Sequence, residues 1–205
     1  MDGTLVDTTA CVEKAWRAIG AKHGVDVDQL IKNVHGRPTL DTVKEFFPNT
    51  CHTSEFAKAF ELNLVNVTEG VHGVPGVHEA VAAVDKNKWA VVTAASKMWA
   101  QTRIGQVGLP LPKTLIAAED VTNGKPNPEG YLRGASALGQ EPKNVVIFED
   151  AVNGVKAGVA SGATVIAVLT STSRSDLVAA GAHHIVDDFT KINIVDHGDH
   201  INLTI

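Results

Sequence analysis

Short apolar runs that alternate with amphipathic stretches, over the part of the chain beyond residue 73, constrain the fold more than any other feature. Four of these runs occupy residues 88–94, 113–118, 144–150 and 164–170. Their apolar residues are consecutive and often β-branched, which is typical of strands buried on both faces. Strands that alternate with helices form parallel sheets. We therefore predict an α/β fold, a Rossmann-like doubly wound parallel sheet, to which residues 183–188 and 201–205 add edge strands.

The first third of the chain carries helical signals instead. Apolar residues recur at helical spacing in 11–23, 39–47 and 54–67. Candidate N-terminal capping residues precede or begin these stretches: Asp7, Thr8 or Thr9 for the first, Thr39 for the second and Ser54 for the third. Gly24 and Pro48 are expected to end the first two helices.

This helical stretch contains no strand pattern, and it interrupts the α/β pattern after a short N-terminal loop. We therefore predict a core domain formed by residues 1–8 and 74–205, and an inserted α-helical cap domain formed by residues 9–73. In an open parallel sheet the ligand site lies at the carboxyl ends of the strands. The cap is expected to close over that site.

Charge and cysteine content limit the partners. The 205-residue chain has a formal net charge of −5 and a pI of about 6.0, whereas nucleic-acid-binding domains present a basic face. No apolar run reaches the length of a membrane span, and we expect no targeting segment. Cys11 and Cys51 lack metal-site spacing and suit a reducing compartment. We expect a monomeric cytoplasmic protein that binds neither nucleic acid nor membrane.

The polar residues that follow the predicted strands suit a phosphate site. Thr93 follows the first apolar run, Lys125 follows the loop after the second, and Glu149 and Asp150 end the third. Because parallel strands end at the same edge of a sheet, these side chains are expected to converge on one crevice, together with Asp2 of the N-terminal loop. The hydroxyl and nearby backbone N–H groups donate to phosphoryl oxygens, the lysine supplies positive charge, and the paired acids suit Mg²⁺.

Each feature has a simpler structural interpretation when it is taken alone. Asp2-Gly3 is a common turn sequence, and Lys125 fits a solvated loop. Glu149-Asp150 fits the acidic start of a helix. Their joint occurrence, each at a strand end, favours a site.

Four motifs resemble those of the haloacid dehalogenase superfamily, in the capped branch that contains small-molecule phosphatases and β-phosphoglucomutase. MDGTLVDTT at residues 1–9 resembles the first family motif, DxDGTLxDS/T, and VVTAAS at 91–96 resembles the second. GKPNPEGYL at 124–132 resembles the third motif, and VVIFEDAVNGVKAGVASG at 145–162 resembles the fourth. The resemblance covers essentially the whole chain and implies the fold predicted above.

The resemblance implies roles in catalysis and phosphate binding. Asp2 matches the general acid and base of the family. Thr93 and the backbone of Ala94 match the phosphate-binding strand end. Lys125 matches the lysine that neutralises the phosphate and the nucleophile.

The resemblance also implies Mg²⁺ as the cofactor. Asp150 would bind the metal, Glu149 would bind it directly or through a water, and the backbone carbonyl of Asp2 would face it. Asp7 would cap the first helix of the cap domain at the hinge.

The first aspartate of the family motif attacks phosphorus, and it matches the position before Met1, which is not part of this sequence. The apolar strand that precedes it in the family is not part of the sequence either. We therefore expect little or no phosphatase activity, and a weakened sheet, from the 205-residue polypeptide. A reading frame that begins upstream of Met1 is the expected explanation, and a truncated paralogue is the alternative.

The most polar feature of the predicted cap is HGRPT at residues 35–39. Arg37 is placed to reach a substrate hydroxyl or phosphate, with His35 beside it, and a solvated loop is the alternative for Arg37. Several other aromatic and histidine residues are expected to be structural: Trp16, Trp99, His183 and His184.

These observations predict a phosphatase that acts on a small polyol or sugar phosphate, such as glycerol phosphate or a hexose 6-phosphate. One alternative is a β-phosphoglucomutase-like mutase, which must bind a second phosphate and for which Arg37 is the evident cation. Another is a non-catalytic protein that binds phosphate esters through Thr93, Lys125 and Asp150. A dehalogenase is disfavoured, because cleaving a carbon–halogen bond does not need Asp2 as a leaving-group acid.

Overall fold

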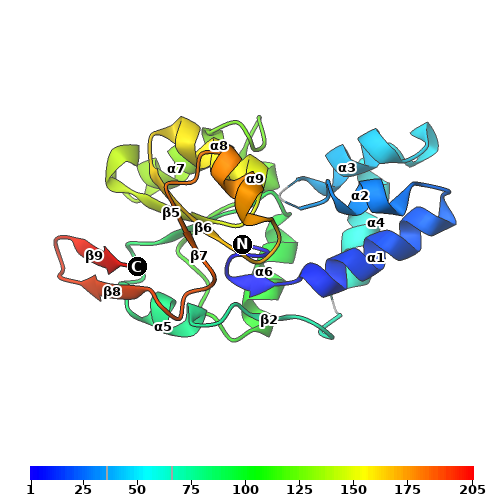
Figure 1. Cartoon of the computed structure of the whole chain (residues 1–205). Helices are drawn as coiled ribbons and strands as arrows, with labels where there is room; N and C mark the ends of the chain where they lie inside the picture. Colours follow the sequence, from blue (N-terminus) through cyan, green and yellow to red (C-terminus); the bar gives the residue numbers. More distant parts are fainter. Residues whose placement is uncertain (36, 66) are drawn as a thin grey trace.

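The computed structural model describes residues 1–35, 37–65 and 67–205. Four helices lie together at one end of the molecule, and we call them the cap lobe (Figure 1). They are α1 (Thr9–Lys22), α2 (Val27–Ile31), α3 (Thr39–Phe46) and α4 (Ser54–Val65). Two short antiparallel strands, β1 (Val6–Asp7) and β2 (His72–Gly73), join this lobe to the rest of the chain, which we call the core lobe.

The helical patterns at 11–23, 39–47 and 54–67 correctly predict the three longer helices of the cap lobe, α1, α3 and α4. The residues that cap these helices differ in part from the predicted ones. Asp7 Oδ1 accepts a hydrogen bond from Thr9 N over 2.9 Å at the start of α1. The predictions for Thr39 and Ser54 are wrong, because both residues are already helical. Pro38 precedes α3, and Thr53 Oγ1 accepts from Phe56 N over 3.1 Å in the first turn of α4.

Helix α2 is not anticipated from the sequence pattern. It has five residues, too few to show an apolar periodicity. Its stabilising contact is local, because Asp26 Oδ1 accepts from the backbone N–H groups of Asp28 and Gln29.

The core lobe is built on parallel strands, as predicted. β3 (Ala90–Val92) pairs with β4 (Thr114–Ile116). β5 (Val146–Glu149), β6 (Thr164–Val168) and β7 (His184–Val186) form a second group, with β6 in the middle. The α/β prediction is confirmed, with the refinement that hydrogen bonds join the strands into two groups.

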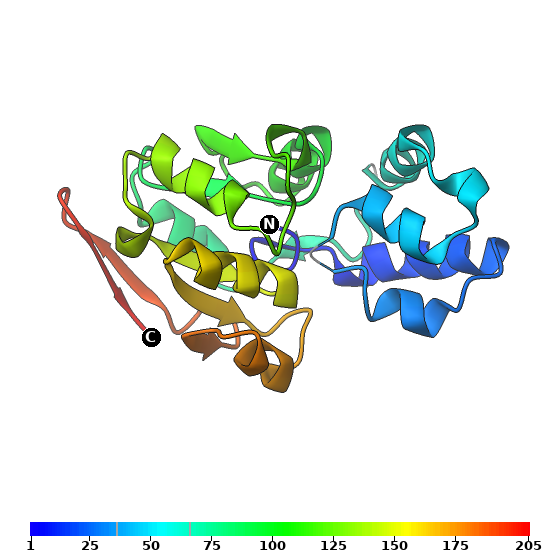
Figure 2. The same ribbon diagram turned by 90° about the horizontal axis from the view of Figure 1, so that it is seen from above.

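The N-terminal residues lie between these two strand groups (Figure 2). Asp2 contacts Trp99 in the helix that follows β3. Thr4 contacts Asp150, which directly follows β5. The first residues of the chain therefore reach the carboxyl ends of both groups.

Helices cover the strands on two sides, with α7 and α8 on one side and α5 and α6 on the other (Figure 1). The helices of the core lobe are α5 (Val77–Ala82), α6 (Lys97–Gln106), α7 (Glu129–Ala137), α8 (Val152–Ser161) and α9 (Arg174–Ala179). Short 3-10 turns occupy Asn49–Cys51, Ala118–Asp120 and Pro142–Asn144. Close packing of α8 depends on Gly158, where a Cβ atom would lie 2.7 Å from Val165 Cγ2 of β6.

The C-terminal segment does not extend the parallel sheet, so the prediction of an edge strand at 201–205 is wrong. β9 (Ile201–Thr204) pairs antiparallel with β8 (Asn193–Asp196) and with no other named strand of the described chain. The hairpin projects from the core lobe at the end opposite the cap lobe (Figure 1). The turn contains Gly198 at φ 92°, which favours a hairpin connection.

Buried side chains connect the two lobes. One apolar cluster includes Trp16 and Phe60 of the cap lobe together with Val91 and Ile104 of the core lobe. A second cluster fills the space between α8 and the β5–β7 strands, around Val155 and Val165.

Within the described residues, no helix combines the length and the apolar character that a membrane crossing requires.

Candidate active site

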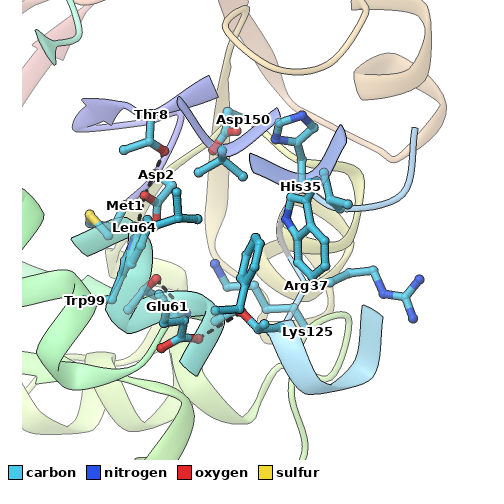
Figure 3. Close-up of a pocket in the computed structure, with 18 of the residues that line it drawn as sticks. Met1, Asp2, Thr8, His35, Arg37, Glu61, Leu64, Trp99, Lys125 and Asp150 are labelled. Carbon is cyan, nitrogen blue, oxygen red and sulfur yellow. Dashed lines mark hydrogen bonds between the residues drawn. The ribbon is translucent and has the colours of Figure 1, made fainter. Parts of the chain in front are cut away.

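A cavity opens between the cap lobe and the carboxyl ends of the strands (Figure 3). The structure brings all of the predicted site residues to its walls. The predicted residues that line it are Asp2, His35, Arg37, Thr93, Ala94, Lys125, Glu149 and Asp150. These residues are separated by up to 148 positions in the chain, and the parallel strands bring them together.

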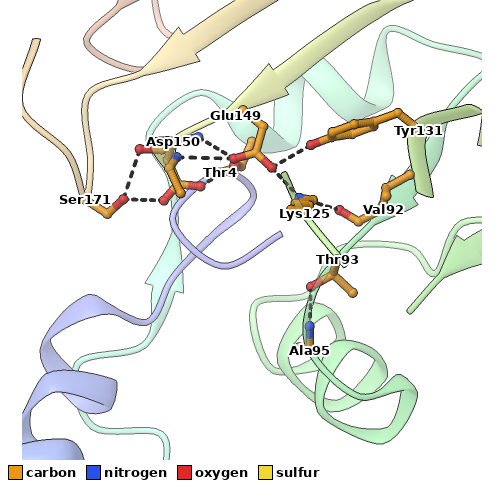
Figure 4. Close-up of polar contacts among 10 residues, drawn as sticks. Thr4, Val92, Thr93, Ala95, Lys125, Tyr131, Glu149, Asp150 and Ser171 are labelled. Atoms are coloured by element: carbon orange, nitrogen blue, oxygen red, sulfur yellow. Dashed lines mark hydrogen bonds and ion pairs between the residues drawn. The ribbon is translucent and has the colours of Figure 1, made fainter. Parts of the chain in front are cut away.

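A buried ion pair lies at the base of the cavity (Figure 4). Glu149, the last residue of β5, accepts hydrogen bonds from Lys125 Nζ and from Tyr131 Oη, the latter over 2.5 Å. The backbone N–H groups of Asp150 and Ala151 donate to its other oxygen. Burial opposes ionisation of Glu149, but the Lys125 ammonium and then the N-terminal ammonium of Met1 outweigh it, with a smaller contribution from the Tyr131 hydroxyl, and hold the pKa of Glu149 below its ordinary value. Glu149 is therefore a carboxylate whose acceptor sites are largely occupied.

Lys125 is fixed by its surroundings. Its Nζ donates to the backbone carbonyl of Val92, the last residue of β3, over 3.3 Å. The same ammonium lies 4.9 Å from the ring centroid of Tyr131. Its side chain is only 9% exposed, so the positive charge acts in a low-dielectric environment. The alternative of a solvated loop lysine is therefore wrong.

Asp150 lies beside this pair and faces the N-terminal loop. It accepts hydrogen bonds from Thr4 Oγ1 over 2.8 Å and from Ser171 Oγ. Burial, and then repulsion by the Glu149 carboxylate, raise the pKa of Asp150 above its ordinary value. A cation placed beside Asp150 would relieve this cost.

Gly3 allows the N-terminal loop to approach Asp150. Its φ of 68° lies in the left-handed region, which favours glycine. A Cβ atom at this position would lie 2.0 Å from Asp150 Oδ2. Glycine is therefore required at position 3 for two reasons: the backbone has a positive φ, and a side chain would collide with Asp150.

Thr93 and Ala94 occupy the turn between β3 and α6. The backbone N–H of Thr93 continues the β3–β4 pairing by donating to Ile116 O over 2.9 Å. Thr93 Oγ1 accepts from Ala95 N over 3.1 Å, and Ser96 caps α6 by accepting from Trp99 N. This turn precedes a helix N-terminus, where N–H groups and the helix dipole favour an anion.

Asp2 is held by two donors. Its Oδ1 accepts from Thr8 Oγ1 over 2.9 Å and from Trp99 Nε1 over 3.0 Å. The Trp99 ring in turn stacks beneath the buried Arg103 guanidinium at 4.2 Å. The prediction that Trp99 only packs in the interior is therefore incomplete, because its indole N–H orients a residue of the cavity wall.

The two predicted cap residues are engaged elsewhere. Arg37 Nη2 pairs with Glu45 Oε2 over 2.6 Å, and its guanidinium points away from the cavity (Figure 3). His35 Nε2 lies 3.2 Å from Glu13 Oε1. The expectation that Arg37 reaches a phosphate therefore has no support in this conformation.

Glu61 of α4 is a cavity residue that sequence reasoning misses. Its two carboxylate oxygens accept from Thr39 Oγ1 over 2.9 Å and from Ser96 Oγ over 2.6 Å. A glutamate inside a helical pattern resembles any solvated position, so the sequence carries no signal that distinguishes it.

The described residues contain no group of three histidine, cysteine or acidic side chains arranged to hold a metal ion. Four of the described carboxylates, those of Asp2, Glu61, Glu149 and Asp150, nevertheless line the cavity. The Asp150 carboxylate and the backbone carbonyl of Asp2, with added water and phosphate oxygens, would form a donor set that suits Mg²⁺. The residues present therefore fit this ion.

Comparisons with known proteins show which family this sequence resembles. A family model described as a haloacid dehalogenase-like hydrolase matches residues 1–162. The chain is 35% identical to 2-deoxyglucose-6-phosphate phosphatase 2 of Saccharomyces cerevisiae, covering 97% of this chain and 89% of that protein. It is 34% identical to glycerol-1-phosphate phosphohydrolase 2 of the same yeast, covering 95% and 82%.

Among solved structures, CbbY from Rhodobacter sphaeroides in complex with phosphate is similar in fold. The TM-score is 0.80 at 22% sequence identity, and the match covers 93% of this chain and 92% of that one. The similarity extends over both the cap lobe and the core lobe. It places the arrangement of helices and parallel strands among known hydrolase-like folds.

Proposed function

This chain belongs to the haloacid dehalogenase-like hydrolase family, and on that premise we propose that it is a Mg²⁺-dependent phosphatase of small polyol or sugar phosphates. Substrates of the kind named for its relatives, a hexose 6-phosphate or a glycerol phosphate, are the first candidates. The observation that carries the proposal is the convergence of Asp2, Thr93, Lys125 and Asp150 on one cavity.

The phosphoryl group is proposed to bind against the turn after β3. Thr93 Oγ1 and the backbone of Ala94 would donate to its oxygens at the start of α6. Lys125 would supply the neutralising charge, and its buried contacts with Glu149 and Val92 hold that charge in place.

Mg²⁺ would be held by the Asp150 carboxylate and by the backbone carbonyl oxygen of Asp2, with Glu149 acting through water because its own acceptor sites are largely occupied. When bound, the ion would neutralise charge on the phosphate oxygens. Thr4 and Ser171 would orient the Asp150 carboxylate for this role.

Asp2 would act as the general acid that protonates the leaving oxygen, and afterwards as the general base that activates water. Its hydrogen bonds to Thr8 and Trp99 fix its carboxylate at the cavity wall. A fixed acid of this kind raises rates because no reorganisation is needed when the proton is transferred.

The attacking carboxylate would come from the residue before Met1, as the family motif implies. We therefore propose that the 205-residue polypeptide releases little or no phosphate, and that a polypeptide extended with an apolar strand ending in aspartate is active. A carboxylate nucleophile divides one difficult displacement into two easier steps.

The cap lobe, within the proposed cap domain of residues 9–73, would exclude water and select the leaving group. A mutase remains the second candidate function, but it needs a cation for a second phosphate. The nearest cap candidate, Arg37, is paired with Glu45 and points away from the cavity. A non-catalytic phosphate-ester-binding protein is the third candidate, and the same experiment distinguishes it.

The proposal is tested by Mg²⁺-dependent phosphate release from a panel of glycerol and hexose phosphates. The 205-residue polypeptide is compared with the extended one, and both are checked for cooperative unfolding. Activity in the extended protein alone supports the proposal. If both proteins fold and bind phosphate esters but neither releases phosphate, the non-catalytic function is supported instead.

A further inference from the structure

Glu61 connects the cap lobe to the phosphate side of the cavity. It lies on α4, and one carboxylate oxygen accepts from Thr39 Oγ1 of the cap lobe over 2.9 Å. The other oxygen accepts from Ser96 Oγ of the core lobe over 2.6 Å. Ser96 begins the helix that follows Thr93 and Ala94, so Glu61 lies beside the turn proposed to bind phosphate.

The rest of the cap-lobe wall offers little to a polar ligand. The polar ends of Arg37 and His35 are engaged by Glu45 and Glu13. The apolar residues of this wall are Val12, Trp16, Val34, Phe60 and Leu64. Among the described residues that line the cavity, Glu61 is the carboxylate contributed by the cap lobe.

The acceptor capacity of Glu61 exceeds its observed use. A carboxylate accepts about four hydrogen bonds, and Glu61 accepts one at each oxygen from Thr39 and Ser96. Further donors, such as substrate hydroxyls, therefore fit without displacing either partner. A fixed negative charge at this wall would in addition repel a second phosphate.

We infer that Glu61 determines leaving-group specificity, by accepting hydrogen bonds from the hydroxyls of an uncharged polyol or sugar and by repelling a second phosphate. This inference rests on the proposed function, because it assumes that the phosphate lies against Thr93 and Lys125. It names a neutral hydroxylated leaving group as the substrate class, and it disfavours bisphosphates.

Calorimetric binding to the 205-residue polypeptide tests the inference without requiring turnover. The ligands are a hexose 6-phosphate, phenyl phosphate, a hexose bisphosphate and inorganic phosphate, each titrated with Mg²⁺ present. In Glu61→Gln, hexose 6-phosphate should bind about 10- to 100-fold more weakly, the range expected for hydrogen bonds to a charged acceptor. Phenyl phosphate and inorganic phosphate should change by less than about threefold, and the bisphosphate should bind more tightly.

Glu55→Gln is the matched control, because Glu55 is an exposed residue on the same helix. Ser96→Ala keeps the Glu61 carboxylate but removes both its hydrogen bond to the core lobe and the cap of α6. Because loss of the cap acts on every phosphate ester alike, the preference between two esters is the quantity compared. This variant should preserve the preference for hexose 6-phosphate over phenyl phosphate. Glu61→Asp keeps the negative charge and should therefore still bind the bisphosphate as weakly as the parent does. If the glutamine variant unfolds, Glu61→Asp is measured in its place.

The outcomes separate the two proposals. Equal weakening of hexose 6-phosphate and phenyl phosphate in Glu61→Gln, or loss in Ser96→Ala of the preference for hexose 6-phosphate over phenyl phosphate, would overturn the inference while leaving the proposed function intact. Failure of the parent polypeptide to bind inorganic phosphate or any ester would overturn the proposed function, and the inference with it.

Discussion

The indole Nε1 of Trp99 donates a hydrogen bond to Asp2 Oδ1 over 3.0 Å, and this contact ties the helix after β3 to the N-terminal loop. Asp2 also accepts from Thr8 at the start of the cap lobe. One carboxylate oxygen is therefore oriented by two donors, one on α6 of the core lobe and one on the residue that precedes α1. If Asp2 transfers a proton to the leaving group, Trp99 is a positioning residue for that step.

Replacing Trp99 by phenylalanine should lower kcat for phosphate release by about tenfold in the extended protein, with little change in KM, because an indole N–H bond to a carboxylate contributes about 1.5–3 kcal/mol. Trp89→Phe is the control, since Trp89 does not line the cavity. Steady-state kinetics measure kcat and KM separately and so check this prediction. An increase in KM with kcat unchanged would show that Trp99 serves binding instead.

Replacing Gly3 by alanine should abolish phosphate binding and destabilise the fold by about 1–3 kcal/mol, the cost of a strained backbone position. The added Cβ would lie 2.0 Å from Asp150 Oδ2. Gly139→Ala is a matched control, because Gly139 has a φ of 67° with no atom within 4 Å of the added Cβ. Equal loss of stability and unaltered binding in the two variants would contradict the steric account.

Replacing Lys125 by methionine leaves the Glu149 carboxylate buried without its cation, and it should lower the free energy of unfolding by about 3–5 kcal/mol. The double variant Lys125→Met/Glu149→Gln should recover part of this loss, since it also removes the carboxylate that Lys125 neutralises. Urea unfolding measures both effects. Lys143→Met, which removes a lysine that is 74% exposed, should change stability little.

The contact between Lys88 and Asp196 predicts a pH dependence of stability. The Lys88 ammonium, and then the backbone N–H groups of Gly198 and Asp85, lower the pKa of Asp196 from 3.8 to about 2. Because the folded-state pKa is lower, this stabilisation is present above the unfolded pKa and is lost as the pH falls through about 2.

The difference in unfolding free energy between the parent and Asp196→Asn should therefore be constant near neutral pH and shrink in acid. Asp199→Asn, in the same hairpin, serves as the control. Chemical denaturation at a series of pH values measures the difference. A difference that grows in acid would show that the sign is wrong.

The site residues that lie at the carboxyl ends of the parallel strands were predictable from the sequence. Thr93 and Glu149 directly follow consecutive apolar runs, and Asp150 follows Glu149. The topology of a parallel sheet brings such positions to one edge. The location of Lys125 needed the longer motif around it. The chemistry proposed for these residues remains to be tested.

Contacts between elements distant in sequence were not predictable in the same way. Glu61 and Trp99 lie within helices, where a charged or aromatic residue usually marks a solvated or packed face. Their partners, Ser96 and Asp2, belong to other elements. The separate hairpin of β9 likewise depends on its turn at Gly198, since its apolar residues alone fit a sheet edge equally well.

The central claim is that Asp2 of this cavity supports hydrolysis of a small phosphomonoester. The most direct measurement is Mg²⁺-dependent phosphate release from a hexose 6-phosphate by the extended protein and by its Asp2→Asn variant, with Asp7→Asn as the control. Loss of a general acid and base should lower kcat by about 10²- to 10⁴-fold in Asp2→Asn, and by much less in Asp7→Asn. Undiminished phosphate release by Asp2→Asn would contradict the account.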